Sequence, residues 1–401
     1  MKNIKRYEEH LMESKRDSPE MEAYSRIVWP SYADPDPLVT LKKELEAGLD
    51  PNMTDEDGKT LIGGIIHSDQ GWGSEAKGRI IEELVKAGAD PNMLTSWKGW
   101  MDIKVTPLMA AVSDGKKGFV ELLLRLGADP NGKTDKTPLP LAVAVRMANT
   151  AIVKLLLDAG AKADAWDKTG GSMVQIYLKM MTIDWTWLTR YENWAEEQAN
   201  SPELLKMLID AGADPNKISV PSEPPIMWAS RPKFRLVKSR RKRLDPIPEN
   251  VRVLLEGGAD PNAEDARGLT ALFVAADWNQ KEIVRMLLDA GADPNHDNGR
   301  GRTPLWDAGK NSVIVRELIK AGADAKAVDP SDGTPLLKLW VKWDYKNSAK
   351  ELVKAGADLS SAFDSLDDVK KFFGEKTSWI PEASLQKIMK RQRSRGAFGR
   401  F

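Results

Sequence analysis

A short phrase built from small residues, Asp, Pro and Asn recurs nine times along the 401-residue chain and limits its possible folds more than any other feature. It reads AGLDPN at 47–52 and AGADPN at 87–92, and seven related copies follow. The nine phrase glycines are residues 48, 88, 127, 160, 212, 258, 291, 322 and 356, with spacings of 40, 39, 33, 52, 46, 33, 31 and 34. Regular self-similarity of this kind is the signature of a repeat protein, so the sequence predicts units of about 33 residues with insertions in four of them.

Each phrase closes an amphipathic helix. Before Gly291, the segment KEIVRMLLDA places Ile283, Val284, Leu287 and Leu288 on one apolar face. The glycine is expected to adopt the left-handed conformation at the helix end, where a side chain would cause steric strain. The Asp-Pro-Asn that follows predicts an extended turn, because Pro disfavours helix in the residue before it.

In four units, Thr-Pro-Leu indicates the start of the next helix, at 106–108, 137–139, 303–305 and 334–336. Thr is expected to cap the free amides, and Pro tolerates the first helical turn. Each unit is therefore predicted to be a helix, a tight turn, a second helix and a finger loop.

These residues resemble the ankyrin repeat family, most closely over 265–295, DARGLTALFVAADWNQKEIVRMLLDAGADPN. The resemblance extends from about Pro37 to Leu359 and implies an all-α, ankyrin-type solenoid of about nine to ten repeats. We expect one domain over 1–401, because repeats share a continuous core. Its parts would be a cap and first repeat at 1–47, core repeats at 48–359, and a degenerate cap with a basic tail at 360–401. Caps are expected from a weak helix at 21–29 and a helix pair at 365–392.

One departure from the family pattern is systematic. The family usually has His after Thr-Pro-Leu, whereas this chain has Met109, Pro140, Phe273, Trp306 and Leu337. The packing between repeats is therefore expected to be more apolar and less hydrogen-bonded than in the family, and Trp306 is expected to be core.

Composition argues against catalysis and metal binding. The chain has no Cys and only three widely separated His, which excludes disulfides, thiolate zinc sites and a Cys nucleophile and disfavours a His metal cage. It has no GxSxG or Walker motif. Gly71-Trp72-Gly73 lacks the context of a dinucleotide loop, and 55–58 is interpreted as a finger tip. We expect a cytoplasmic protein, since neither a signal peptide nor a membrane span is evident. We also expect it to be a monomer without enzymatic activity or cofactor.

The resemblance implies partner contacts beside the finger glycines and after the small-residue pair of each inner helix. The charged, apolar and aromatic residues at such positions are Lys168, Thr169, Arg267, Leu269, Asp277, Trp278, Arg300, Arg302 and Lys310. Exposed Trp is enriched in binding hot spots, and the chain has 14 Trp. Further candidates are Trp97, Trp100, Trp166, Trp340 and Trp343. The alternative for these Trp is that they fill space left by the missing His or pack inserted segments.

Insertions are expected between the inner and outer helices of a unit at 68–78, 182–200, 231–247 and 343–348, all on the edge opposite the fingertips. They form either a second interaction surface or turns that simply tolerate insertion. The segment 231–243 has eight basic residues and no acid, and the tail from Lys387 adds six in what is expected to be a flexible end. Without these two segments the neutral chain would have 45 basic residues against 59 acidic ones.

The basic segments give a candidate polyanion site with these residues: Arg231, Lys233, Arg235, Lys238, Arg240, Arg241, Lys242, Arg243, Lys390, Arg391, Arg393 and Arg395. Short basic runs are also common in solvated loops. The sequence thus favours a non-enzymatic scaffold that binds and inhibits or neutralises one specific protein, in an immunity, antitoxin-like or phage counter-defence role. The alternative is a nucleic-acid-associated or nuclear adaptor.

Overall fold

A computed structural model describes residues 19–29, 36–68, 73–97, 103–132, 139–166, 171–180, 201–218, 223–237 and 240–398. The chain divides into two compact units. Unit 1 comprises residues 1–177 and 193–199, and unit 2 comprises residues 178–192 and 200–401. One continuous stack over 1–401 therefore stays a prediction. Trp100, Lys168, Thr169, Lys238 and the insertion at 182–200 lie outside the described residues.

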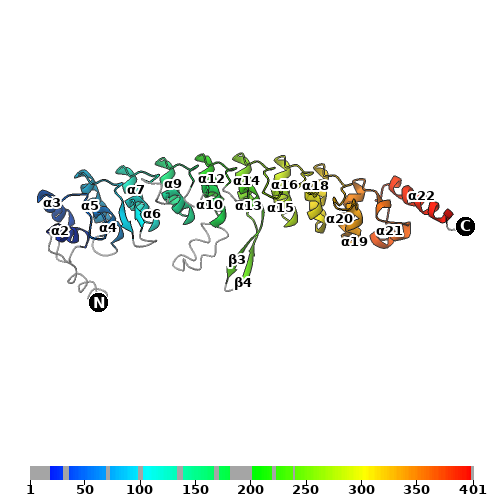
Figure 1. Ribbon diagram of the computed structural model, residues 1–401, viewed down its shortest axis with the longest axis horizontal. Coiled ribbons are helices and arrows are strands. Elements are labelled where there is room, and N and C mark those ends of the chain that lie inside the picture. Colours follow the sequence, from blue (N-terminus) through cyan, green and yellow to red (C-terminus); the bar gives the residue numbers. More distant parts are fainter. Residues whose placement is uncertain are drawn as a thin grey trace. The chain divides into compact units, whose positions relative to one another are not determined.

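Unit 1 is a stack of helix pairs in two rows (Figure 1). Its inner row is α2 (Pro19–Val28), α4 (Leu61–His67), α6 (Pro107–Ser113), α8 (Pro140–Arg146) and the start of α10 (Met173–Met180). Its outer row is α3 (Pro37–Glu46), α5 (Ser74–Lys86), α7 (Lys117–Arg125) and α9 (Thr150–Asp158). Helices contact the next member of their own row, as α4 does α6 and α5 does α7. A finger carries the antiparallel strands β1 (Thr95–Trp97) and β2 (Ile103–Val105).

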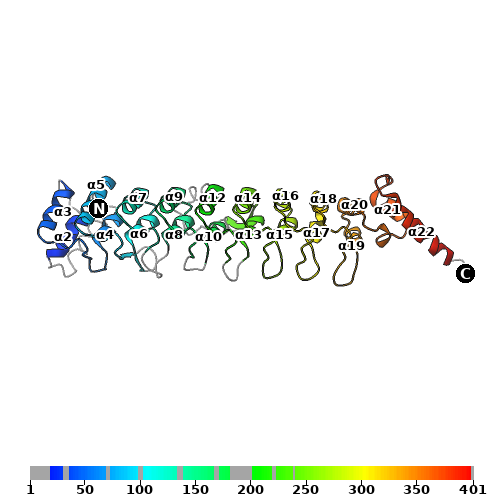
Figure 2. The ribbon, with the colours of Figure 1, turned by 90° about the horizontal axis from the view of Figure 1, so that it is seen from above.

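Unit 2 repeats the arrangement. Its inner row is α13 (Pro225–Ser230), α15 (Ala271–Asp277), α17 (Pro304–Asp307) with the 3₁₀ helix η2 (Ala308–Lys310), and α19 (Leu336–Lys342). Its outer row is α12 (Pro202–Asp210), α14 (Pro248–Glu256), α16 (Lys281–Asp289), α18 (Ser312–Lys320) and α20 (Lys346–Lys354). The end is formed by η3 (Leu359–Ser361), α21 (Leu366–Phe373) and α22 (Glu382–Phe398). Finger loops leave the inner row on one side (Figure 2).

The phrase glycines end the outer helices as predicted. All nine have φ between 89° and 104°, which only glycine adopts without strain. At Gly291 the N–H groups of Gly291 and Ala292 donate to Leu288 and Leu287, closing the last turn. The predicted stop signal is confirmed.

The Asn that ends six of the nine phrases has a role that sequence reasoning missed. Nδ2 of Asn262 donates to the carbonyl of Gly291 in the next phrase, and the N–H of Asp293 donates to Oδ1 of Asn262, at 3.2 and 2.8 Å. The same pair of bonds joins six junctions of the described chain, made by Asn52, Asn92, Asn131, Asn216, Asn262 and Asn295. These bonds connect neighbouring repeats without the residues that replace the family's His, so the expectation of fewer hydrogen bonds than in the family stays a prediction.

The residues at the position of the family's His are buried where the register was read correctly. Met109, Phe273, Trp306 and Leu337 are all buried, and Trp306 is core as predicted. Pro140 was placed wrongly, because it is the first residue of α8. A proline fits that position since the first-turn N–H is unpaired in any helix.

Thr caps its helix at only some of the predicted starts. Thr106 Oγ1 accepts the N–H of Met109 at 3.2 Å. Thr303 makes no side-chain cap, and α19 begins two residues after Thr334. The caps at these two positions were predicted wrongly.

Two further predictions about the C-terminal part are wrong. No insertion separates α19 from α20, because Asp344, with φ of 60°, makes the same turn as Asn279, with φ of 62°, between α15 and α16. The basic tail is not a flexible end as far as Phe398, because it is helical in α22 and anchored by the fully buried Ile388.

Candidate protein-interaction site

The first inner helix of unit 2, α13, has a tryptophan on its exposed side. In α13 the side chains of Ile226, Met227 and Ala229 point into the core, and Trp228 is half-buried on the opposite side. The Arg231 guanidinium lies 4.5 Å from the centre of the Trp228 ring, a cation–π distance. The Trp228 indole N–H is buried and has no hydrogen-bond partner in the part of the chain that the structure describes.

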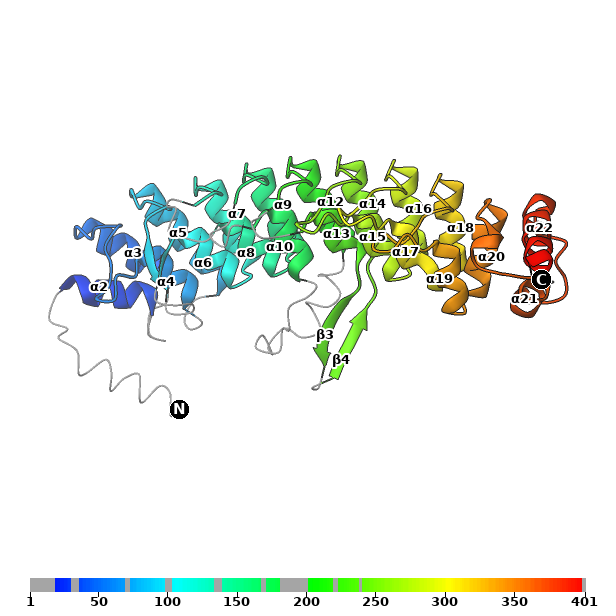
Figure 3. The same cartoon turned by 45° about the vertical axis from the view of Figure 1, so that its right-hand side comes forward.

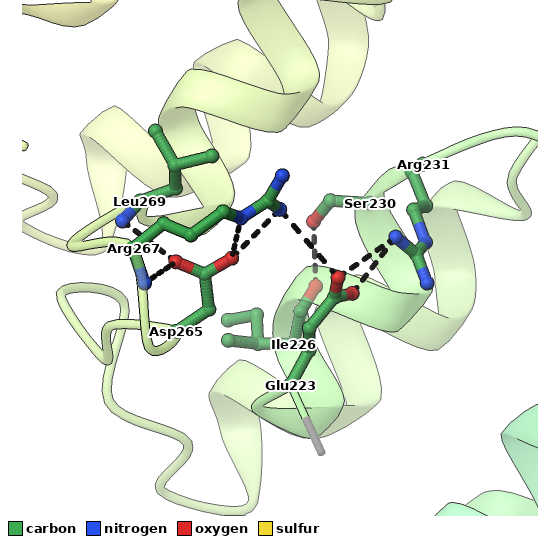
Figure 4. Close-up of polar contacts among 7 residues, drawn as sticks. All are labelled: Glu223, Ile226, Ser230, Arg231, Asp265, Arg267 and Leu269. Carbon is green, nitrogen blue, oxygen red and sulfur yellow. Dashed lines mark hydrogen bonds and ion pairs between the residues drawn. The ribbon is translucent and has the colours of Figure 1, made fainter. Parts of the chain in front are cut away.

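Glu223 joins two arginines beside this tryptophan (Figure 4). Arg231 Nη1 lies 3.0 and 2.9 Å from the two carboxylate oxygens of Glu223. Arg267 Nη2, from the following finger, lies 3.7 Å from the same carboxylate. The inner helix of one repeat is thus joined to the finger of the next by a chain of charges.

Asp265 holds that finger in a defined shape. Its carboxylate accepts the N–H groups of Arg267 and Leu269 at 2.8 and 3.0 Å and pairs with the Arg267 guanidinium at 2.8 Å. Burial raises the pKa of Asp265, but these hydrogen bonds outweigh it and hold the pKa below its usual value. Asp265 therefore stays ionised, and Arg267, whose side chain is 64% exposed, is held in place before any partner arrives.

Beyond this cluster, the surface carries charges from the next repeats. Arg302 lies 3.6 Å from Asp307 and 5.4 Å from the centre of the buried Trp306 ring. Burial raises the pKa of Asp307, Arg302 opposes this, and the Asp277 carboxylate adds to the rise. The Asp307 carboxylate thus lies between one positive group, Arg302, and one negative group, Asp277.

The structure separates the predicted contact residues into three groups. Arg267, Asp277, Arg300, Arg302 and Lys310 are exposed in unit 2, and Leu269 is half-buried there. Trp166 of unit 1 and Trp343 of unit 2 are each 45% exposed, and Trp97 belongs to β1. The prediction that Trp340 contacts a partner is wrong, because its side chain is fully buried.

Trp278 is less available than predicted. It is half-buried, and the Arg243 guanidinium lies 5.6 Å from its ring centre while Arg243 Nη2 donates to its carbonyl at 3.4 Å. Arg243 belongs to the antiparallel hairpin of β3 (Lys233–Val237) and β4 (Arg240–Leu244), which lies within the predicted insertion 231–247. The hairpin extends away from the helices between α13 and α14 (Figure 3).

Several residues of the predicted polyanion site already form ion pairs or hydrogen bonds within this chain. Arg231 is held by Glu223, and Arg243 pairs with Asp245 at 3.0 Å. Arg391 donates to the carbonyl of Ser360. Lys233, Arg235, Arg240, Arg241 and Lys242 lie in the two strands, and Lys390, Arg393 and Arg395 lie in α22.

Sequence reasoning missed Trp228 and Glu223. The signal was present, because Pro225-Ile226-Met227-Trp228 occupies the place of Pro304-Leu305-Trp306-Asp307 at the start of an inner helix. A proline at the first helical position in both segments would have given the register.

Comparison with known proteins agrees with this architecture. A family model described as ankyrin repeats (three copies) matches residues 74–167 and 193–298. The chain belongs to the ankyrin repeat family. Ankyrin repeats generally mediate protein–protein interactions and are typically not enzymes. Among the described residues, no group of three His, Asp or Glu could hold a metal ion, and no helix is long and apolar enough to cross a membrane.

The individual similarities are modest. A putative ankyrin repeat-containing protein of Treponema pallidum (strain Nichols) is 28% identical over 34% of this chain and 41% of its own length. The transient receptor potential channel pyrexia of Drosophila melanogaster is 27% identical over 39% of this chain, which matches only 18% of that channel. The chain thus spans less than half of either curated relative.

Solved structures of ankyrin repeat domains are also similar. One from Acinetobacter baumannii AYE is 28% identical, with a TM-score of 0.43, and covers 54% of this chain and 98% of its own. The ankyrin repeat domain of Bcl-3, a member of the IkappaB protein family, is 25% identical, with a TM-score of 0.41, over 58% of this chain and 92% of its own.

Proposed function

We propose that this ankyrin repeat protein binds one specific protein partner through the exposed inner row of unit 2, with Trp228 at the centre of the interface. The observation that carries the proposal is the half-buried Trp228 ring, which lies against the Arg231 guanidinium and between charged groups on adjacent repeats. Trp and Arg dominate binding hot spots.

The arginine side chains around Trp228 are already held in place, and this supports the same proposal. Arg231 is held by Glu223, and Arg267 is held by Asp265, so neither side chain has to be fully ordered on binding. Ordering a long side chain costs about 0.5–1.5 kcal/mol at an interface, and a prearranged surface avoids much of that cost.

A surface of this kind acts on its partner by covering part of it. We therefore propose an inhibitory or neutralising role, such as that of an immunity or antitoxin-like protein or a phage counter-defence protein. The expected effect is loss of the partner's activity at one-to-one stoichiometry, measured by adding the purified chain to the purified partner. Full partner activity at saturating chain would exclude inhibition and leave recruitment.

The binding site is tested by capturing the partner from a lysate of the source cells and measuring its affinity by titration calorimetry. Trp228→Ala is expected to weaken binding by about 2 kcal/mol, roughly thirtyfold. Trp166→Ala, which removes an equally large and 45% exposed side chain from unit 1, is the matched control and should change binding by less than twofold. A change of less than twofold in Trp228→Ala, with the variant folded by circular dichroism, would remove Trp228 from the interface.

The hairpin supports a second candidate function, binding of a polyanion such as a nucleic acid. Its register places Arg235 opposite Lys242 and Val237 opposite Arg240, and this concentrates positive charge on a projecting element. Phosphate contacts release counterions, so the affinity for an oligonucleotide should fall steeply with salt. Replacing 233–244 by a short turn should abolish this binding in a polarisation titration. No affinity of the intact chain at about 50 mM salt would exclude this function.

A further inference from the structure

Four exposed cations in a finger and the inner helices of unit 2 form no ion pair with any residue that the structure describes. Arg300 lies in a finger, Lys310 ends η2, and Lys338 and Lys342 lie in α19. All four side chains are exposed, and none forms an ion pair in the described part of the chain. We call these four residues the inner cation row.

Basic side chains of the outer row differ in this respect. Arg285 pairs with Glu317 at 3.2 Å, and Arg316 pairs with Glu351 at 3.1 Å across neighbouring repeats. Further outer-row pairs are Arg252 with Glu249, Lys320 with Glu317 and Lys354 with Glu351. The outer surface thus largely neutralises its own charge, whereas the inner cation row does not.

The geometry of α19 keeps two of these charges on one side. Leu336, Leu337 and Trp340 form its buried side, and Lys338 and Lys342 lie one turn apart on the other. Residues at this spacing have Cβ atoms about 5–6 Å apart. Like charges at that distance repel each other, and an anion lying between them would relieve the repulsion.

An apolar anchor lies directly beside the row. Trp343 follows Lys342 at the end of α19, is 45% exposed, and packs one side of its ring near Tyr345, with centroids 5.9 Å apart. The inner cation row without such a ring would suit any polyanion. The combination with an exposed aromatic ring favours a partner that brings both acidic and apolar side chains.

We propose that the inner cation row and Trp343 bind an acidic segment of the protein partner, with an apolar side chain of that segment against Trp343. This inference rests on the proposed protein-binding function and specifies the chemistry of the partner. A nucleic acid fits less well, because Asp277 and Asp307 lie on the neighbouring part of the same surface and repel a continuing phosphate backbone.

The experiment uses the full chain and a fluorescein-labelled twelve-residue peptide of alternating Glu and Ser with one central Leu. Fluorescence anisotropy is measured at about 50 mM salt. The screening length is then roughly 14 Å, so exposed charges interact more strongly than at physiological salt. The triple variant Lys310→Gln, Lys338→Gln and Lys342→Gln is expected to bind about tenfold more weakly, because each exposed contact contributes modestly. The matched control neutralises three lysines of the outer row, Lys281→Gln, Lys320→Gln and Lys354→Gln, and should change the affinity by less than twofold.

Trp343→Ala separates the anchor from the charges. It should weaken the peptide that contains Leu and leave a Leu-free peptide of the same charge unchanged. Equal losses in the two triple variants, or no binding by the wild-type chain, would overturn the inference. Tighter binding of a twelve-residue oligothymidine that the inner triple variant abolishes would also overturn it and assign the row to nucleic acid.

The proposed function can fail or stand separately from this inference. If the captured partner still depends on Trp228 but binds the inner triple variant as well as wild type, only the acidic-segment inference fails. If the peptide result holds and Trp228→Ala has no effect on the captured partner, the Trp228-centred interface is what fails.

Discussion

Asn262 offers the sharpest test of how the repeats are joined. Its side chain donates to the carbonyl of Gly291 and accepts the N–H of Asp293. One amide group thus joins Asn262 to two residues of the next repeat, 29 and 31 positions further along the chain. Its own N–H donates to Asp260 at 2.9 Å and closes the local turn. Asn262→Ala removes both bonds between the repeats and leaves the turn intact.

The expected cost follows from the number and exposure of these bonds. A typical net contribution is about 0.5–1.5 kcal/mol per hydrogen bond, and water can replace part of it where the groups are exposed, as they are here. We therefore expect Asn262→Ala to lower the free energy of unfolding by about 1–2 kcal/mol. Because stability in a stack depends on the coupling of neighbouring repeats, α15 and α16 should also lose hydrogen-exchange protection first.

The assay is urea unfolding of the full chain followed by circular dichroism, where the midpoint should fall at an unchanged slope. Asn347→Ala is the control, since Asn347 is an exposed residue of α20 without a side-chain hydrogen bond in the described chain. Asn295→Ala at the next junction should cost a similar amount, and the double variant should be nearly additive. A loss of less than about 0.3 kcal/mol in Asn262→Ala would refute the view that the side-chain ladder couples the repeats.

Three further predictions concern packing and ionisation. Gly63→Ala should destabilise unit 1 by about 1–3 kcal/mol in thermal unfolding, because the added methyl would collide with the buried Thr95. Trp340→Ala should cost about 3–5 kcal/mol in urea unfolding as a core truncation, whereas Trp343→Ala should cost less than about 1 kcal/mol; similar losses would contradict the burial difference. The raised pKa of Asp307 means that its ionised form weakens the fold, so the unfolding free energy falls as pH rises from about 3.8 through the folded-state pKa. Asp307→Asn should therefore stabilise the protein at pH 7 but not at pH 3, and no difference between the two pH values would contradict this.

The elements that depend on local chemistry were predictable from the sequence. The helix stop at Gly291 and its counterparts follows from the conformational freedom of glycine, which is a property of one residue. The buried position of Trp306 followed from its place after Thr-Pro-Leu, since repeat register alone decides it. Helix starts were less certain, because a proline such as Pro138 or Pro140 satisfies the same local rule.

The site was only partly predictable, because its contacts cross between repeats. Arg267 and Lys310 were found from the register, but the pairing of Arg267 with Glu223 joins residues 44 positions apart. Trp340 was misplaced because its burial depends on Gly309 in the preceding repeat, whose missing side chain leaves room for the indole. Such complementarity has no signature in either local segment.

The sequence by itself determined that this protein is built of repeats, because nine helix-ending phrases mark units of about 33 residues whose apolar faces are buried only by stacking. It also predicted the exposed position of Arg267 and Lys310 from the repeat register. The tertiary structure alone decided which charges are neutralised and which are not. Arg231 and Arg267 pair with Glu223, while Lys338 and Lys342 form no ion pair within the described ranges, because ion pairing depends on distances between neighbouring repeats that residue spacing does not contain.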